Sequence, residues 1–169
     1  MTPAAHIKYI LSIVNKRIWP IRKLKFAGVN DEDLKYYYIM KLRSVMESAA
    51  PVFHSMLTLE NTTDLERVQK NVTCIIMGNR YTTYEEALEY LELDTLLKRR
   101  EQICLDFALK CFHNRKFSHL FVPTPANDHD LREPVRRFLE PQCTTERYRK
   151  SPLVYLTRRL NEYFSNNTS

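Results

Sequence analysis

The stretch AAHIKYILSIVNKRIWPIRKLKF, residues 4–26, decides the fold class of this chain. Its apolar residues recur every three or four positions, at Ile7, Ile10, Leu11, Val14, Ile18, Ile21 and Leu24. This spacing puts them on one side of an α-helix and therefore predicts an amphipathic helix. Pro20 lacks an amide hydrogen, so we expect it to kink the helix or divide it near Trp19. Gly28 suits the end of this helix.

Helix signals continue along the rest of the chain. Acidic residues at positions 31–33 predict the start of a second helix that reaches about Ala49. Residues 63–66 (TDLE) and 83–86 (TYEE) match the capping box, in which a hydroxyl and a carboxylate satisfy free amides at a helix start. Asp94 is placed to cap a further helix, and Ser151 followed by Pro152 predicts the start of a C-terminal helix.

Composition supports a helical protein. The chain has 169 residues, of which 44% are hydrophobic and only two are glycine, the residue that β-rich folds use in tight turns. Between His113 and Arg147 the periodicity fails and four prolines lie among polar residues, which predicts an extended connection. We therefore expect an all-α fold, a small bundle of about five to six helices with an irregular proline-containing connection before a C-terminal helix. The expected parts are a helical bundle over 1–114, the connection over 115–146 and an amphipathic helix over 147–164, packed back on the bundle or peripheral to it.

The charge of the chain points to an anionic partner. The formal net charge is +6, a balance typical of proteins that bind nucleic acid or a membrane surface. The sequence contains no stretch approaching the roughly 20 apolar residues of a membrane helix, and its start carries no secretion signal. We therefore expect an intracellular protein, cytoplasmic or nuclear, with no membrane partner. Its cysteines, Cys74, Cys104, Cys111 and Cys143, are then expected to be reduced thiols.

Six blocks of sequence resemble a known family in order and spacing. The blocks are 15–25 (NKR through RKLK), 48–55 (SAAPVFHS), 65–70 (LERVQK) with 84–91 (YEEALEYL), 98–105 (KRREQICL), 117–121 (FSHLF) and 147–157 (RYRKSPLVYLT). Together they resemble the region downstream of the palm in jockey-like non-LTR retrotransposon reverse transcriptases, over nearly the whole chain. Two departures stand out: Phe53 replaces a usual tryptophan, and 71–74 (NVTC) replaces a more basic stretch.

The resemblance implies a thumb-like bundle whose helices lie along a template-primer duplex and contact its backbone. Lysine and arginine suit this role because they neutralise phosphates and release counterions. The candidate nucleic-acid-binding residues are Lys16, Arg17, Arg22, Lys23, Lys25, Lys98, Arg99 and Arg100. An ordinary solvated helix face remains the alternative for these residues. Stacking of bases on Tyr36, Tyr37 and Tyr38 is an alternative to core packing of these rings.

Catalytic chemistry is not expected from this chain alone. Polymerases of this family need clustered palm aspartates that hold two metal ions, and we expect those residues to belong upstream. Asp31 and Asp33 fit a helix start, and Asp128, His129 and Asp130 fit a solvated loop. Cys104, Cys111, His113 and His119 lack the close ligand pairs of a structural zinc site, so buried thiols are the preferred interpretation. No catalytic residue, metal or cofactor is therefore assigned.

These observations lead to one expected function and two alternatives. We expect a non-catalytic C-terminal fragment of a retrotransposon RNA-directed DNA polymerase that contacts DNA or an RNA/DNA hybrid. The first alternative is a helical interaction module that recruits a protein partner or a second copy through its apolar surface. The second is a relic reading frame without independent function.

Overall fold

The protein is all-α, as predicted. The computed structural model describes residues 3–124 and 138–167. Within these ranges the chain forms helices and turns without a β-strand, apart from one isolated antiparallel bridge between Pro123 and Phe138.

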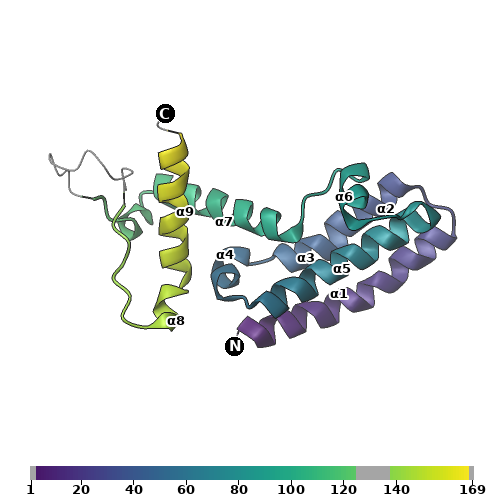
Figure 1. Ribbon diagram of the computed structural model, residues 1–169, viewed down its shortest axis with the longest axis horizontal. Helices are drawn as coiled ribbons and strands as arrows, with labels where there is room; N and C mark the ends of the chain where they lie inside the picture. The colour runs from purple at the N-terminus through teal and green to yellow at the C-terminus, as the bar shows by residue number, and fades with distance from the viewer. Residues whose placement is uncertain (1–2, 125–137, 168–169) are drawn as a thin grey trace. The chain divides into compact units, whose positions relative to one another are not determined.

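From Pro3 to Leu120 the helical elements follow one another closely (Figure 1). In chain order they are α1 (Pro3–Phe26), α2 (Asp31–Tyr38), the π-helical turn η1 (Ile39–Arg43), α3 (Ser44–Glu47), α4 (Ala50–Phe53), the 3-10 turn η2 (His54–Met56), α5 (Leu59–Met77), the 3-10 turn η3 (Gly78–Arg80), α6 (Tyr84–Tyr90), α7 (Leu96–His113), the 3-10 turn η4 (Ser118–Leu120), α8 (Glu146–Arg149) and α9 (Pro152–Asn166).

Two compact units divide the chain. The first comprises Met1–Ala50 and Leu57–Arg100, and the second comprises Pro51–Met56 and Glu101–Ser169. The division falls inside α7, so it does not coincide with the predicted ranges 1–114, 115–146 and 147–164. The reason is that a single continuous helix supplies side chains to both units.

In the first unit, α1, α3 and α5 run side by side (Figure 1). The predicted stripe of α1 is buried, since Ile7, Ile10, Val14, Ile18 and Ile21 are at most 6% exposed. The facing residues from the other helices are Leu34, Leu42, Met46, Leu65, Val68, Val72 and Ile76. Each fully buried aliphatic side chain contributes about 1.5–3 kcal/mol relative to its exposed state, so this stripe sets the orientation of α1.

The end of α1 follows from a local signal. The helix runs through Pro20 without being divided there. It ends in a Schellman motif, in which the Val29 amide donates to the Leu24 carbonyl at 3.1 Å and the Gly28 amide donates to the Lys25 carbonyl at 3.1 Å. Gly28 takes φ +82°, a conformation that side chains with a Cβ rarely adopt, which explains glycine at this position.

The helical run predicted from Asp31 to about Ala49 extends from Asp31 to Glu47, but the π-helical turn in its middle was not predicted. The run consists of α2, the π-helical turn η1 and α3, and Ala49 beyond it takes φ +59°. A π-turn inserts an extra residue into the helical ladder and so rotates the following turn relative to the preceding one. Leu34, Tyr38, Leu42 and Met46 are all fully buried on this run.

Helix starts were predicted with mixed success. Helix α6 begins after Thr83 as predicted, and the Thr83 hydroxyl accepts from the Glu86 amide at 3.3 Å. Helix α9 begins at Pro152 after Ser151, again as predicted, although the Ser151 side chain makes no capping hydrogen bond.

Two predicted caps were wrong. Helix α5 begins four residues before Thr63, because Thr58 accepts from the Asn61 amide at 3.2 Å, and Thr63 bonds back to the Leu59 carbonyl at 2.9 Å. At the start of α7, Thr95 rather than Asp94 accepts from the Lys98 amide at 3.2 Å. In both helices the capping residue is therefore a threonine other than the residue that was predicted.

The second unit is built around an aromatic core. Its buried residues are Cys104, Ala108, Cys111, Phe121, Phe138, Leu156 and Leu160. The rings of Phe112, Phe138 and Phe164 pack mutually, with centroids 5.3 to 6.0 Å apart. Asn161 on α9 also clamps the backbone of Phe138, accepting from its amide at 3.0 Å and donating to its carbonyl at 2.9 Å. These contacts pack α9 against residues of α7.

Candidate nucleic-acid interface

Helix α1 has one face in the core and one face in solvent, and it contains no acidic residue. At about 100° per residue, side chains opposite the buried isoleucines fall on a single exposed face. We call this surface the α1 face, and it consists of Lys8, Tyr9, Lys16, Trp19, Arg22, Lys23 and Phe26, all exposed. Cations and aromatic rings therefore alternate along one side of a helix of 24 residues.

The cations of the α1 face are not neutralised by the fold. Within residues 3–124 and 138–167, Lys8, Lys16, Arg22 and Lys23 form no ion pair with an acidic side chain. Lys23 places its Nζ atom 5.4 Å from the ring centroid of Trp19, a cation–π contact that leaves the ammonium group accessible. Lys16, Arg22 and Lys23 were predicted as candidates, and the structure brings them together on this face. Lys8 was missed.

Two further candidates on α1 are used by the fold. The Arg17 guanidinium donates from Nη1 to the Lys41 carbonyl in the turn η1 at 2.6 Å. Lys25 forms an ion pair with Asp31, with Nζ 2.9 Å from Oδ1. Both lie at the edge of α1, between the core and the exposed face, so they are held by neighbouring elements rather than presented to solvent.

Asp31 is the centre of a small charged cluster. Its second carboxylate oxygen pairs with Arg80, whose guanidinium also lies 5.1 Å from the ring centroid of Tyr90. Burial by itself would raise the pKa of Asp31, but hydrogen bonds from Lys25 and Arg80, together with their charges, lower the pKa below its ordinary value. The carboxylate therefore stays ionised and holds the start of α2, as expected for a helix-start acid. The cap itself is Asn30, which accepts from the Asp33 amide at 2.8 Å.

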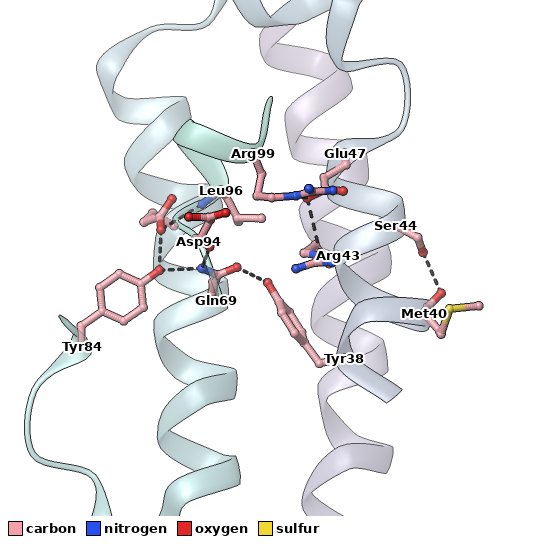
Figure 2. A network of polar contacts seen from close by, with 11 residues as sticks. Tyr38, Met40, Arg43, Ser44, Glu47, Gln69, Tyr84, Asp94, Leu96 and Arg99 are labelled. Carbon is pink, nitrogen blue, oxygen red and sulfur yellow. Dashed lines mark hydrogen bonds and ion pairs between the residues drawn. The ribbon is translucent and has the colours of Figure 1, made fainter. Parts of the chain in front are cut away.

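The second candidate group, on α7, does not form a basic surface. Lys98 pairs with Asp94 at 2.6 Å. Arg99 pairs with Glu47 at 3.3 Å, where Arg43 also approaches the same carboxylate (Figure 2). Arg100 is fully buried, so the expectation that it contacts a phosphate at the surface was wrong. Lys98 meets its acidic partner four residues earlier in the chain, whereas the partner of Arg99 lies 52 residues away in sequence.

A buried polar network lies beside this group, and sequence reasoning missed it (Figure 2). The Tyr38 hydroxyl donates to the Gln69 side-chain oxygen, and the Gln69 amide donates to the Tyr84 hydroxyl at 2.9 Å and to the Asp94 carbonyl at 2.9 Å. The Tyr84 hydroxyl in turn donates to Glu66. Burial raises the pKa of Tyr38 well above its usual range, so the phenol remains a donor. The network joins α2, α5, α6 and the start of α7.

The three consecutive tyrosines therefore have different surroundings. Tyr38 is fully buried in the network, which confirms core packing for that ring. Tyr37 is half-buried, and Tyr36 is 66% exposed. Tyr36 lies one turn beyond Glu32 and Asp33 on α2, so its neighbours in the preceding turn are acidic.

The aromatic residues of the α1 face were also missed from the sequence. Tyr9 is 57% exposed, Trp19 is 64% exposed and Phe26 is 91% exposed. These three residues lie outside the buried stripe that runs from Ile7 to Ile21. A projection down the helix axis is enough to identify them from the sequence.

Two of the hollows in the first unit are lined by residues of the elements described above. One, of about 400 Å³, is lined by Leu11, Asn15, Asp64, Arg67, Val68 and Asn71, and it borders the α1 face. The other, of about 600 Å³, is lined by Asn30, Asp31, Glu32, Lys35, Arg80, Tyr90, Leu91 and Glu92. The larger of these two hollows is lined by three carboxylates and two cations, so its charge does not favour an anion.

The described residues offer no arrangement for metal chemistry. In the ranges 3–124 and 138–167, no group of three or more His, Cys, Asp or Glu side chains is placed to hold a metal ion. Cys104 and Cys111 lie in the aromatic core, whereas His113 and His119 are exposed. Asp128, His129 and Asp130 lie outside the described residues. No described helix is long and apolar enough to cross a membrane.

Comparison of the chain with protein-family models, with curated proteins and with solved structures finds no match. The α1 face and the sequence blocks described above are therefore the features of this chain that bear on its function.

Proposed function

We propose that this chain binds the sugar-phosphate backbone of nucleic acid through the α1 face, without catalysing a reaction. The observation that supports the proposal is the unneutralised charge of this face. Lys8, Lys16, Arg22 and Lys23 share one side of a helix that has no acid and form no ion pair with the described residues. Such cations bind phosphates and release the counterions condensed on nucleic acid.

The resemblance to non-LTR reverse transcriptases implies the same contact with the nucleic-acid backbone. In that proposal the chain is a non-catalytic C-terminal part of an RNA-directed DNA polymerase, and its ligand is DNA or an RNA/DNA hybrid. The contact would be made by α1 and not by α7, because Lys98 and Arg99 are paired and Arg100 is buried.

The salt dependence of binding tests this proposal. Binding to a fluorescent duplex is measured by anisotropy at several salt concentrations, for the wild type and for the triple variant Lys16→Ala, Arg22→Ala, Lys23→Ala. Each lost phosphate contact lowers the magnitude of the slope of log K against log salt by about one, so we expect a decrease of about three.

A matched triple variant controls for net charge. Lys98→Ala, Arg149→Ala and Lys150→Ala remove the same charge at side chains that already pair with Asp94 or Glu146. We expect this control to leave the slope nearly unchanged. Equal losses in both variants would contradict a site on α1, and a wild type that fails to bind at low salt would refute the proposal.

A second candidate function follows from apolar exposure. Phe26 at 91% and Leu59 at 85% are the kind of exposed side chains that protein interfaces cover. In this alternative the chain recruits a protein partner or a second copy. Size-exclusion chromatography at several protein concentrations distinguishes the interaction module from the nucleic-acid-binding protein. Self-association would favour the interaction module if it is insensitive to salt and is abolished by Phe26→Ser.

A further inference from the structure

Two rings on the α1 face are arranged as separate platforms. Trp19 and Phe26 are seven positions apart on α1, so they lie almost in line along the same stripe, about 10 Å apart along the axis. Trp19 and Phe26 are 64% and 91% exposed, so most of each residue is open to solvent. An indole and a phenyl ring so exposed offer flat apolar surfaces that a flat partner can cover.

Cations occupy the space between these two platforms. Arg22 and Lys23 stand three and four positions after Trp19 and four and three positions before Phe26. Side chains at such spacings are neighbours on a helix surface, and the Lys23 ammonium is already 5.4 Å from the Trp19 ring centroid. Along this stripe a ring is followed by two cations and then by a second ring. Lys16 and Lys8 extend the positive charge toward the start of the helix.

This order fits the chemistry of an unpaired strand. A single strand exposes both the faces of its bases and its phosphates, whereas a duplex stacks its bases against each other and offers only phosphates and groove edges. A spacing of about 10 Å is too wide for two bases in direct stacking, about 3.4 Å apart, so each ring would take a separate base from an extended strand.

A membrane surface fits the same face less well. Helices that bind in the membrane interface insert a continuous apolar side, rich in Trp, Phe and Leu, and keep their cations on the opposite side. In α1 the aliphatic side is buried in the core of the first unit, and the exposed side mixes cations with aromatic rings.

We propose that the α1 face binds single-stranded nucleic acid, with unpaired bases stacked on Trp19 and Phe26 and the adjoining phosphates held by Arg22, Lys23 and Lys16. This inference rests on the proposed function and narrows it, since it adds a preference for unpaired strands over duplex.

Trp19 is the sole tryptophan of the chain, so its fluorescence reports on this site alone. The full chain is titrated with oligo(dT), with a duplex of the same length, and with an abasic deoxyribose-phosphate oligomer of the same charge. We expect oligo(dT) to quench the emission strongly and the abasic oligomer to leave it nearly unchanged at saturation, although both carry the same phosphates.

Substitutions separate stacking from charge. Trp19→Ala and Phe26→Ala are each expected to weaken binding of oligo(dT) about fivefold to a hundredfold, and to weaken duplex binding less than about twofold. Trp19→Phe keeps a stacking ring and should restore most of the affinity. Tyr36→Ala removes an equally exposed ring beside acidic residues and should change neither affinity. Circular dichroism confirms that each variant is folded.

The outcomes distinguish this inference from the function on which it rests. If Trp19→Ala and Phe26→Ala leave oligo(dT) binding intact while the triple cation variant weakens binding of both ligands, base stacking is refuted and backbone binding stands. If neither oligo(dT) nor duplex binds at low salt, both proposals fail. A blue shift of Trp19 emission with phosphatidylserine vesicles, in the absence of quenching by oligo(dT), would overturn the inference in favour of a lipid surface.

Discussion

The Arg17 side chain donates from Nη1 to the main-chain carbonyl of Lys41, 2.6 Å away and 24 residues distant in sequence. This bond connects α1 to the π-helical turn η1, at the point where the helical ladder of the second helix changes register. Arg17 therefore supports the fold next to the α1 face and does not belong to that face.

Arg17→Ala should destabilise the protein more than it weakens the proposed binding of nucleic acid. Hydrogen bonds from a charged donor contribute more than neutral ones, and at this partly exposed position we expect a loss of about 1–2 kcal/mol in the free energy of unfolding. Urea denaturation followed by circular dichroism measures it. Lys16→Ala is the matched control, with a change within about 0.5 kcal/mol. A large affinity loss in Arg17→Ala without a change in stability would contradict this role.

Gln69 is the hub of the buried network. Gln69→Leu keeps the volume but removes one acceptor and two donors, leaving the Tyr38 hydroxyl and the Asp94 carbonyl without these bonds. Unsatisfied buried polar groups are costly, so we expect a loss of about 2–4 kcal/mol in the free energy of unfolding. Gln102→Leu, on the exposed side of α7, should change stability by less than about 0.5 kcal/mol. Similar losses in the two variants would argue against the network.

Acid should weaken the first unit through Asp31. Hydrogen bonds from Lys25 and Arg80 more than offset the effect of burial and hold the pKa of Asp31 below 3.8. Because the folded pKa is the lower one, the carboxylate stabilises the folded state above the unfolded pKa, and this stabilisation is lost as the pH falls through the folded pKa.

The comparison with Asp31→Asn tests this dependence. We expect the difference in unfolding free energy between wild type and Asp31→Asn to be largest near neutral pH and to shrink as the pH falls below 3.8. Asp106→Asn, at an exposed position on α7, is the control for loss of a carboxylate. A difference that stays constant from neutral pH to well below 3.8 would contradict the ion pairs of Asp31.

The clamp of Asn161 on Phe138 should dominate the stability of the second unit. Asn161→Leu leaves the buried amide and carbonyl of Phe138 without their partners, and we expect a loss of about 2–4 kcal/mol. Hydrogen exchange at the Phe138 amide gives a local readout and should become faster in the variant. Asn166→Leu, near the exposed end of α9, should leave that exchange rate unchanged. If the Phe138 amide stays protected from exchange in Asn161→Leu, another group must accept its hydrogen bond.

Local signals were sufficient for much of the helical framework. The stripe from Ile7 to Ile21 predicted which side of α1 is buried, and Thr83 and the Ser151–Pro152 pair predicted the starts of α6 and α9. These features depend on residues within one or two helical turns, so the sequence contains all the information that they need. The exposed side of α1, with its rings and cations, follows from the same geometry.

Tertiary structure decided which cations remain available to a ligand. Lys16, Arg22 and Lys23 stay unpaired with the described residues, while Arg99 meets Glu47 across 52 residues of sequence and Arg17 meets Lys41 across 24. The π-helical turn η1 was not predicted either, and Tyr38, Leu42 and Met46, on the run that contains it, are fully buried. Charge and periodicity are local properties of the chain, but neutralisation of a charge depends on a partner that only the folded chain brings near.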